Sequence, residues 1–297
     1  MEPSGNRADP AAAGIPAAAP GRMLKQRLLT VAAVLPLLLA CIFLLPNPGW
    51  ALLMTVPTAL GALEWAKLAG YGRVARALFV ATVPVSCLLL IAVAASPRFP
   101  TLAMNLATAL FVLALLFWAI AVPVWLYSKW QVSHPLLLAV AGWIVLVPAW
   151  LAVVRLQRSA WLLLIVLGVV WVADTAAYFA GHRFGRNKLA PQISPGKTWE
   201  GVMGAYIAVL GYSLAASLIL QPSASGYDHL AVLLFACVLT AFGIVGDLFE
   251  SWIKRQAGAK DSGQLLPGHG GVLDRIDSLT AALPFAGLYF IQAARST

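Results

Sequence analysis

Nine stretches of mostly apolar residues, separated by short polar segments, constrain this chain more than any other feature. A helix needs about 20 such residues to cross a bilayer. The chain is 61% hydrophobic and 10% charged, whereas an ordinary soluble domain is about 25% charged. We therefore expect an all-α fold, a polytopic transmembrane helical bundle. The predicted spans are residues 28–45, 50–66, 77–96, 102–122, 135–154, 160–180, 201–220, 229–248 and 279–294.

The basic residues follow the alternation of these spans. With a cytoplasmic N-terminus, 16 of the 20 Lys and Arg residues fall in segments predicted to be cytoplasmic and 4 in segments on the other side. This is the bias expected of membrane proteins. Topology thus accounts for the net charge of +9, and we expect no nucleic-acid binding. The predicted organisation is a disordered Ala/Pro-rich cytoplasmic tail (1–24), N-terminal transmembrane helices (25–155) and a catalytic transmembrane domain with cytoplasmic loops (156–297).

Acidic residues concentrate in the C-terminal half, since only 3 of the 11 Asp and Glu residues precede residue 170. Asp174 lies inside a predicted span, and a carboxylate there is costly and usually functional. For Asp174 alone, a simple ion pair is an equally good interpretation. Together with Asp247, Glu250, Asp274 and Asp277, it favours a metal-binding cluster. Mg²⁺ commonly combines one or two carboxylates with phosphates and water.

The densest polar run, residues 251–278, follows the predicted eighth span. Its basic residues can neutralise phosphates, and its glycines let backbone N–H groups approach an anion. Seven charges and five glycines are more than a plain connector needs. His269 is compatible with a general base, a cap or a phosphate donor, and we favour the donor. Arg275 can serve a phosphate oxygen or a carboxylate.

A second polar run, residues 181–201, offers further anion-binding groups. Its Gly-Lys-Thr sequence ends like a phosphate-binding P-loop, but Pro191 stands where that motif requires Gly. The Lys197 ammonium and the hydroxyls of Ser194 and Thr198 still suit an anion, beside a helix N-terminus near Thr198. Ser194 or Thr198 is also a candidate cap for that helix, and capping and anion binding are compatible.

The run from Ser251 to Asp277 resembles the signature of the phosphatidate cytidylyltransferases (CDP-diglyceride synthases). The pattern is Ser-x-Ile-Lys-Arg, four residues, Lys-Asp, and then Pro-x-His-Gly-Gly-x-x-Asp-Arg-x-Asp. The segments 174–178, 194–198 and 246–251 resemble family motifs in the same order. The resemblance covers about residues 160–290, whereas residues 25–155 match only as a generic hydrophobic pattern.

This resemblance implies an enzyme of the bacterial-type inner membrane that faces the cytoplasm. It would convert CTP and phosphatidic acid to CDP-diacylglycerol and pyrophosphate with Mg²⁺, and it leaves room for a monovalent cation and a homodimer. The implied metal ligands are Asp247, Asp274 and Asp277. The implied catalytic residues are Lys197, Lys254, Arg255, Lys260, Asp261, His269 and Arg275, and the implied substrate-binding residues are Asp174, Ser194, Thr198, Gly270 and Gly271.

Three other classes of protein deserve comparison. A CTP-dependent lipid kinase would release CDP instead of pyrophosphate. An ion-coupled transporter should place ionisable residues near mid-membrane, whereas here they crowd the predicted cytoplasmic ends. An alcohol phosphotransferase that consumes CDP-diacylglycerol should carry a run with characteristic Asp-Gly and Ala-Arg spacing, which this sequence lacks.

Overall fold

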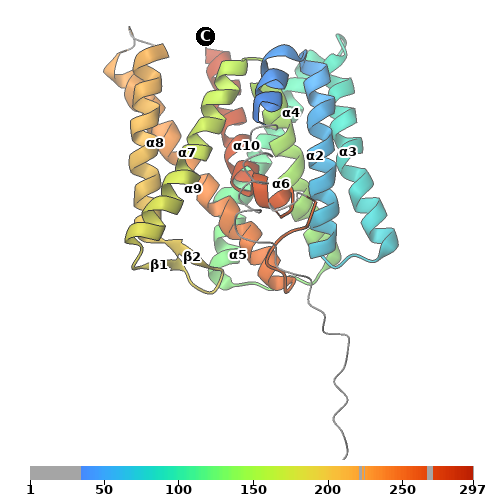
Figure 1. Ribbon diagram of the computed structural model, residues 1–297. Coiled ribbons are helices and arrows are strands. Elements are labelled where there is room, and N and C mark those ends of the chain that lie inside the picture. The colour runs from blue at the N-terminus through green and yellow to red at the C-terminus, as the bar shows by residue number, and fades with distance from the viewer. Residues whose placement is uncertain (1–34, 221–222, 224, 266–269, 297) are drawn as a thin grey trace, which may run out of the picture.

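The computed structural model describes residues 35–220, 223, 225–265 and 270–296, which form a bundle of long helices with one small hairpin (Figure 1). The predicted tail and His269 lie outside the described residues. A helix is found at the position of every predicted span. The helices are Leu35–Leu44, α2 (Asn47–Leu68), α3 (Arg73–Ala95), α4 (Pro100–Leu116), α5 (Val122–Ser128), α6 (Pro135–Leu156), α7 (Ala160–Phe184), α8 (Trp199–Leu220), α9 (Gly226–Gln256) and α10 (Leu273–Ser296).

Six helical segments of the described chain are long and apolar enough to cross a membrane. One of them, Pro100–Ser128, joins α4 and α5 through a π-helical turn at Phe117–Ala121. α2, α10 and the helix Leu35–Leu44 are not among the six. The prediction of a helical membrane bundle is therefore confirmed in its coarse form.

The fold is not purely helical, because a hairpin joins α7 to α8. Strands β1 (Lys188–Ala190) and β2 (Ser194–Thr198) pair antiparallel, with Lys188 opposite Thr198 and Ala190 opposite Ser194. The all-α prediction was wrong at this point. The hairpin has no alternating apolar pattern, and Pro195 within β2 argues against a strand, so no sequence pattern predicted it.

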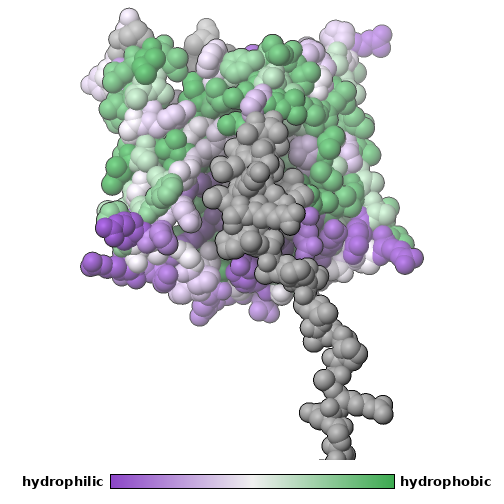
Figure 2. Space-filling view, viewed as in Figure 1, coloured by the Kyte–Doolittle hydropathy of each residue, from purple (hydrophilic) through white to green (hydrophobic). Residues whose placement is uncertain are grey.

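The polar segments gather at one end of the bundle. The β1–β2 hairpin, the C-terminal end of α9 and the α2–α3 connection all lie at the lower end of the bundle in Figure 1, whereas the α8–α9 connection lies at the opposite end. Figure 2 shows a hydrophilic band at the lower end and a hydrophobic surface above it. The distribution of Lys and Arg likewise predicts that the hairpin, the end of α9 and the α2–α3 connection lie on one side of the membrane. We call this end the polar end.

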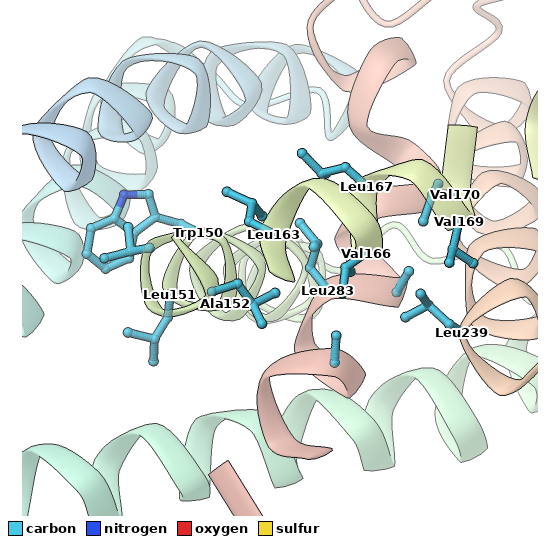
Figure 3. Packing of buried hydrophobic residues seen from close by; sticks show 14 of the residues in the cluster. Trp150, Leu151, Ala152, Leu163, Val166, Leu167, Val169, Val170, Leu239 and Leu283 are labelled. Carbon is cyan, nitrogen blue, oxygen red and sulfur yellow. The ribbon is translucent and has the colours of Figure 1, made fainter. Parts of the chain in front are cut away.

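The core joins the two halves of the chain. Trp150, Leu151 and Ala152 of α6 are buried in one cluster with Leu163 of α7 and Leu283 of α10 (Figure 3). α10 also packs on α4 and α9. The last helix is thus held between N-terminal and C-terminal helices.

Candidate active site

The β1–β2 hairpin brings Lys197 to the polar end. Asn187 Nδ2 donates a hydrogen bond to Glu200 Oε1 over 2.8 Å and so closes the base of the hairpin. Arg255, near the end of α9, donates from Nε to the Ile193 carbonyl oxygen over 3.4 Å. The hairpin is therefore tied at its base and at its turn, and Arg255 packs directly on it.

Thr198 caps the helix that follows the hairpin. Its Oγ1 accepts a hydrogen bond from Gly201 N over 3.1 Å, as an N-cap hydroxyl does. The Thr198 side chain is buried. The predicted helix start is confirmed, and of the two candidate caps it is Thr198 that fills the role. Ser194 instead begins β2.

Lys197 reaches a group of carboxylates at the polar end. Its Nζ lies 2.6 Å from Asp247 Oδ2 of α9. The charges of Asp247 and Lys197 also act on Asp174 of α7 and on Asp277 of α10. Ser278 Oγ donates to Asp174 Oδ1 over 3.3 Å. We call Lys197, Asp174, Asp247 and Asp277 the acidic group; its members come from β2, α7, α9 and α10.

A glycine lets α9 and α10 approach closely at this group. A Cβ added to Gly246 would lie 2.6 Å from the carbonyl oxygen of Asp277 and 3.0 Å from Ala281 Cβ, closer than side chains normally pack. The residue that precedes Asp247 is therefore tightly packed against the backbone of Asp277. This contact places the two carboxylates on facing helices.

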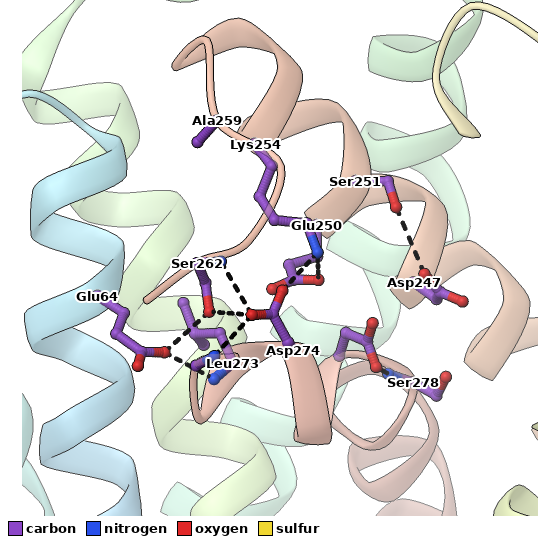
Figure 4. Close-up of polar contacts among 12 residues, drawn as sticks. Glu64, Asp247, Glu250, Ser251, Lys254, Ala259, Ser262, Leu273, Asp274 and Ser278 are labelled. Carbon is purple, nitrogen blue, oxygen red and sulfur yellow. Dashed lines mark hydrogen bonds and ion pairs between the residues drawn. The ribbon is translucent and has the colours of Figure 1, made fainter. Parts of the chain in front are cut away.

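A second cluster anchors the loop between α9 and α10. Lys254 Nζ lies 2.6 Å from Asp274 Oδ1, and Asp274 Oδ2 accepts hydrogen bonds from Ser262 N over 2.9 Å, Ser262 Oγ over 3.0 Å and Gly271 N over 2.8 Å. We call Glu64, Lys254, Ser262, Gly271 and Asp274 the loop-anchoring group (Figure 4). The anion that Gly271 approaches here is the protein's own carboxylate.

Asp274 and Asp277 differ in electrostatic setting, although both precede the predicted span 279–294. Burial opposes ionisation of Asp274, but hydrogen bonds from Lys254, Gly271 and Ser262 outweigh it and hold the pKa of that carboxyl below its usual range. Burial, with the charges of Asp247 and Glu250, raises the pKa of Asp277 well above its usual range. Asp274 is thus a fully hydrogen-bonded anion, whereas for Asp277 the charge of Lys197 and the hydrogen bond from Ser278 N do not offset burial and the neighbouring carboxylates.

Glu64 of α2 is the member of the site that the sequence analysis missed. Its side chain is fully buried. Glu64 Oε1 accepts a hydrogen bond from Val272 N over 3.0 Å, and Oε2 accepts bonds from Leu273 N and Ser262 Oγ, each over 2.9 Å. It was visible as a lone carboxylate inside the predicted span 50–66, the same signal that singled out Asp174.

Glu250 connects the two clusters. Figure 4 shows it between Asp247 and Asp274. Its Oε2 lies 2.7 Å from Lys254 Nζ, while its Oε1 is buried and receives no hydrogen bond from the residues that the structure describes. A buried carboxylate oxygen without a donor is costly. It marks a place where a cation would be stabilised.

The donor chemistry of this region fits Mg²⁺. Five carboxylates lie here, and the ion pairs found among the described residues link Asp247 to Lys197 and link Glu250 and Asp274 to Lys254. The charge of Lys197 also acts on Asp174 and Asp277. In the described part of the chain, no three His, Cys, Asp or Glu side chains are grouped closely enough to hold a metal by themselves. An Mg²⁺ ion would complete its shell with water and substrate phosphates, as it commonly does.

The remaining predicted residues lie on the surface of the loop or on the first turn of α10. Lys260 and Asp261 are exposed. Gly270 has a φ of 82°, which favours glycine, and an added Cβ would lie 2.8 Å from Asp274 Oδ2. Arg275 is exposed and borders a cavity. The structure thus brings most of the predicted residues to one end, in two clusters joined by Glu250.

An apolar cavity of about 480 Å³ begins beside the site. The helix Leu35–Leu44, α2, α6, α7 and α10 line it, and Arg275 is its one charged lining residue among those described. The first turns of α10 therefore present Asp274 and Asp277 to the two clusters and Arg275 to the cavity. The representative apolar lining residues are Leu38, Trp50, Met54, Leu146, Trp171 and Leu279.

Comparison with known proteins identifies the family. A family model described as the cytidylyltransferase family matches residues 25–292, which is most of the chain. The chain belongs to the cytidylyltransferase family. Its match extends through the N-terminal helices, where the sequence pattern alone had appeared generic. The resemblance of the polar run 251–277 to this family is confirmed, and the chain is a nucleotidyltransferase.

Three bacterial enzymes are similar to this chain. A phosphatidate cytidylyltransferase of Pseudomonas aeruginosa is 44% identical over 277 residues, covering 90% of this chain and 97% of that protein. One of Haemophilus influenzae is 34% identical over 285 residues, covering 90% and 99%. A shorter match, to the phosphatidate cytidylyltransferase of Thermotoga maritima, is 42% identical over 129 residues and covers 43% of this chain and 48% of that protein.

Proposed function

We propose that this cytidylyltransferase moves the cytidylyl group of CTP to the phosphate of phosphatidic acid, giving CDP-diacylglycerol and pyrophosphate. The observation that carries the proposal is the acidic group at the polar end, beside a mostly apolar cavity in which Arg275 is the one charged lining residue among those described. The carboxylates suit a nucleotide triphosphate that carries Mg²⁺. The apolar cavity suits an acyl chain of a lipid. The names of the similar bacterial enzymes support the same substrates.

The reaction asks the protein to bring two polyanions together. A phosphate oxygen of the lipid forms a bond to the α-phosphorus of CTP, and the bond from that phosphorus to the bridging oxygen of the β-phosphate breaks. The attacking oxygen is already anionic, so no strong general base is required. The contributions expected of the protein are orientation and neutralisation of charge that develops on the pyrophosphate.

The lysines and arginines supply that neutralisation. Lys197 and Lys254 are held against carboxylates in the structure, and an arriving triphosphate would share their ammonium protons. Arg275 is exposed and lines the apolar cavity, where its guanidinium would bind the lipid phosphate while an acyl chain occupies the cavity. A cavity of this size lies in the usual range for ligand sites, about 300–1,000 Å³.

Mg²⁺ is the proposed cofactor, and when bound it neutralises charge on the triphosphate. Asp247 and Asp277 are the best-suited ligands because few donors compensate their charge. Asp274, also expected as a ligand, already accepts hydrogen bonds from Lys254 Nζ, Ser262 N and Gly271 N, and it shares the Ser262 hydroxyl proton with Glu64. It would join the metal only by releasing one of them, and the Lys254 contact is the one that a phosphate can replace.

We further propose that the polar end faces the cytoplasm of a bacterial inner membrane, with all nine helical segments crossing and the N-terminus inside. The 16-to-4 division of Lys and Arg between alternate loops supports this orientation. CTP is water-soluble and the acidic group opens on the end where the hydrophilic band lies (Figure 2). Nucleotide and lipid would then reach the site from different phases.

The test uses purified full-length protein in detergent with phosphatidic acid, Mg²⁺ and CTP labelled on either the α- or the γ-phosphate. We expect α-label in the lipid and γ-label in pyrophosphate. Label from the γ-position in the lipid, with release of CDP, would instead identify a lipid kinase. Asp247→Asn should abolish transfer, whereas Asp228→Asn, in the capping box at the other end of α9, should not.

A further inference from the structure

Glu64 makes contacts that helix packing does not require. It lies in α2, yet its three hydrogen-bond donors all belong to residues 262–273. Its side chain is fully buried, and these three donors, the ones found among the described residues, are neutral. A buried carboxylate needs such donors, because an unpaired charge would be strongly destabilising. An acid in this otherwise apolar part of α2 therefore indicates that Glu64 serves to hold the loop between α9 and α10 in place.

The contacts form a cap for α10. Leu273 is the first residue of α10, and the N–H groups of Val272 and Leu273 are among those that a helix leaves unpaired at its start. Glu64 accepts both. Its negative charge also lies at the positive end of the helix dipole. The start of α10 is thus fixed by a residue more than 200 positions earlier in the chain, in addition to the local hydrogen bond from Gly271 N to Asp274 Oδ2.

The same carboxylate reaches Asp274 through Ser262. Ser262 Oγ lies 2.9 Å from Glu64 Oε2 and 3.0 Å from Asp274 Oδ2, so its single proton is within reach of both acids. Two glycines pack closely against the Glu64 carboxylate, where a larger side chain would not fit. A Cβ at Gly263 would lie 2.5 Å from Glu64 Oε1, and a Cβ at Gly271 would lie 2.5 Å from Glu64 Oε2.

We infer that Glu64 is a positioning residue for the transfer reaction. By fixing Ser262 and the first turn of α10, it holds Asp274 and Asp277 where they serve the nucleotide and its metal ion. The inference rests on the proposed function for what the positioned residues do. It also assigns a role in the reaction to the N-terminal half of the chain.

The test replaces Glu64 by Gln, which keeps the volume but puts an amide NH₂ against N–H donors. In enzyme without substrates, hydrogen–deuterium exchange followed by mass spectrometry should show lost protection of the Val272 and Leu273 amides. With phosphatidic acid, CTP and Mg²⁺, kcat should fall about 10-fold to 100-fold, the range for lost outer-shell partners. The Mg²⁺ concentration for half-maximal rate should rise, while folding of the purified protein is retained.

Asp228→Asn is the matched control, because it is also an acid-to-amide change but lies in a cap at the opposite end of α9. It should leave exchange near residue 272 and the Mg²⁺ dependence unchanged. If Glu64→Gln does not fold, Ser262→Ala takes its place. It removes the hydroxyl between Glu64 and Asp274 and should raise the Mg²⁺ requirement in the same direction.

The results distinguish failure of the Glu64 inference from failure of the proposed function. Normal amide protection in folded Glu64→Gln, or normal kcat with normal Mg²⁺ dependence, would overturn the inference while leaving the proposed function intact. A fall in active enzyme without any change in Mg²⁺ dependence would also overturn it, since that result means a purely structural role. If the unmodified enzyme transfers no label, the proposed function fails, and the exchange experiment still tests the Glu64 contact.

Discussion

Lys197 Nζ lies 2.6 Å from Asp247 Oδ2, and this ion pair joins the only described hairpin to the end of α9. Both side chains are partly shielded, with exposed fractions of 22% and 31%. The pair thus remains accessible to a ligand from the polar end. A phosphate that enters competes with Asp247 for the ammonium group, while a divalent cation competes with Lys197 for the carboxylate.

Lys197→Ala should lower kcat/KM for CTP by about 10²-fold or more, because one positioned charge that stabilises the transition state is lost. Radiolabel transfer at varied CTP concentration measures the effect. Lys188→Ala is the matched control, since Lys188 is an exposed lysine on the neighbouring strand. Equal activity of the two variants would contradict a role for Lys197 in binding or transfer.

Gly246→Ala should destabilise the protein by about 1–3 kcal/mol, the usual cost of overpacking. The new methyl would meet the Asp277 carbonyl oxygen at 2.6 Å and push α9 from α10. Thermal unfolding in detergent measures the change, and activity should fall further than stability because Asp247 and Asp277 separate. Gly211→Ala, where an added Cβ meets nothing within 4 Å, should unfold like the unmodified protein.

Ala149→Phe should shift substrate preference toward phosphatidic acid with shorter acyl chains. Ala149 is buried and lines the apolar cavity, so a phenyl ring there would occupy space proposed for a chain. Competition between short-chain and long-chain phosphatidic acid measures the preference, and KM for CTP should stay constant. Ala92→Phe adds the same ring to an exposed position of α3; a parallel shift in that variant would argue against the cavity as the acyl site.

Thr198→Val should cost about 1 kcal/mol of stability, the typical value of an N-cap hydrogen bond. Valine keeps the shape of the buried side chain but cannot accept the hydrogen bond from Gly201 N. Thermal unfolding of Thr198→Val and Thr198→Ser separates the two properties. Serine keeps the hydroxyl and should restore most of the difference, whereas equal losses in both variants would mean that packing of the methyl group dominates.

The helices were predictable because lipid solvation leaves a strong signal in sequence. Twenty apolar residues in a row have few alternatives, and every predicted span has a helix in the structure. The small hairpin was not predictable. Its strands are three and five residues long, and they are held by contacts from Glu200 and Arg255, not by an apolar face of their own.

Residue type and spacing predicted which polar residues gather at this end of the bundle, but not which of them pair. The run 251–277 pointed to phosphate chemistry, and Asp247 and Lys197 do meet. The division into an acidic group and a loop-anchoring group depends on which helix faces which, and spacing carries no such information. Glu64 was overlooked because it stands far from the other acids in sequence, although a buried acid in a span is itself a functional signal.

The hydrogen bonds of Glu64 have a consequence for protein engineering. A chimera that grafts the C-terminal helices onto the N-terminal helices of another membrane protein would join two well-formed hydrophobic surfaces and still leave the Val272 and Leu273 amides without an acceptor. Such a hybrid would insert into the membrane but would lack enzymatic activity. An active chimera of two relatives should therefore take Glu64 from the same parent as Ser262, Gly263 and Gly271.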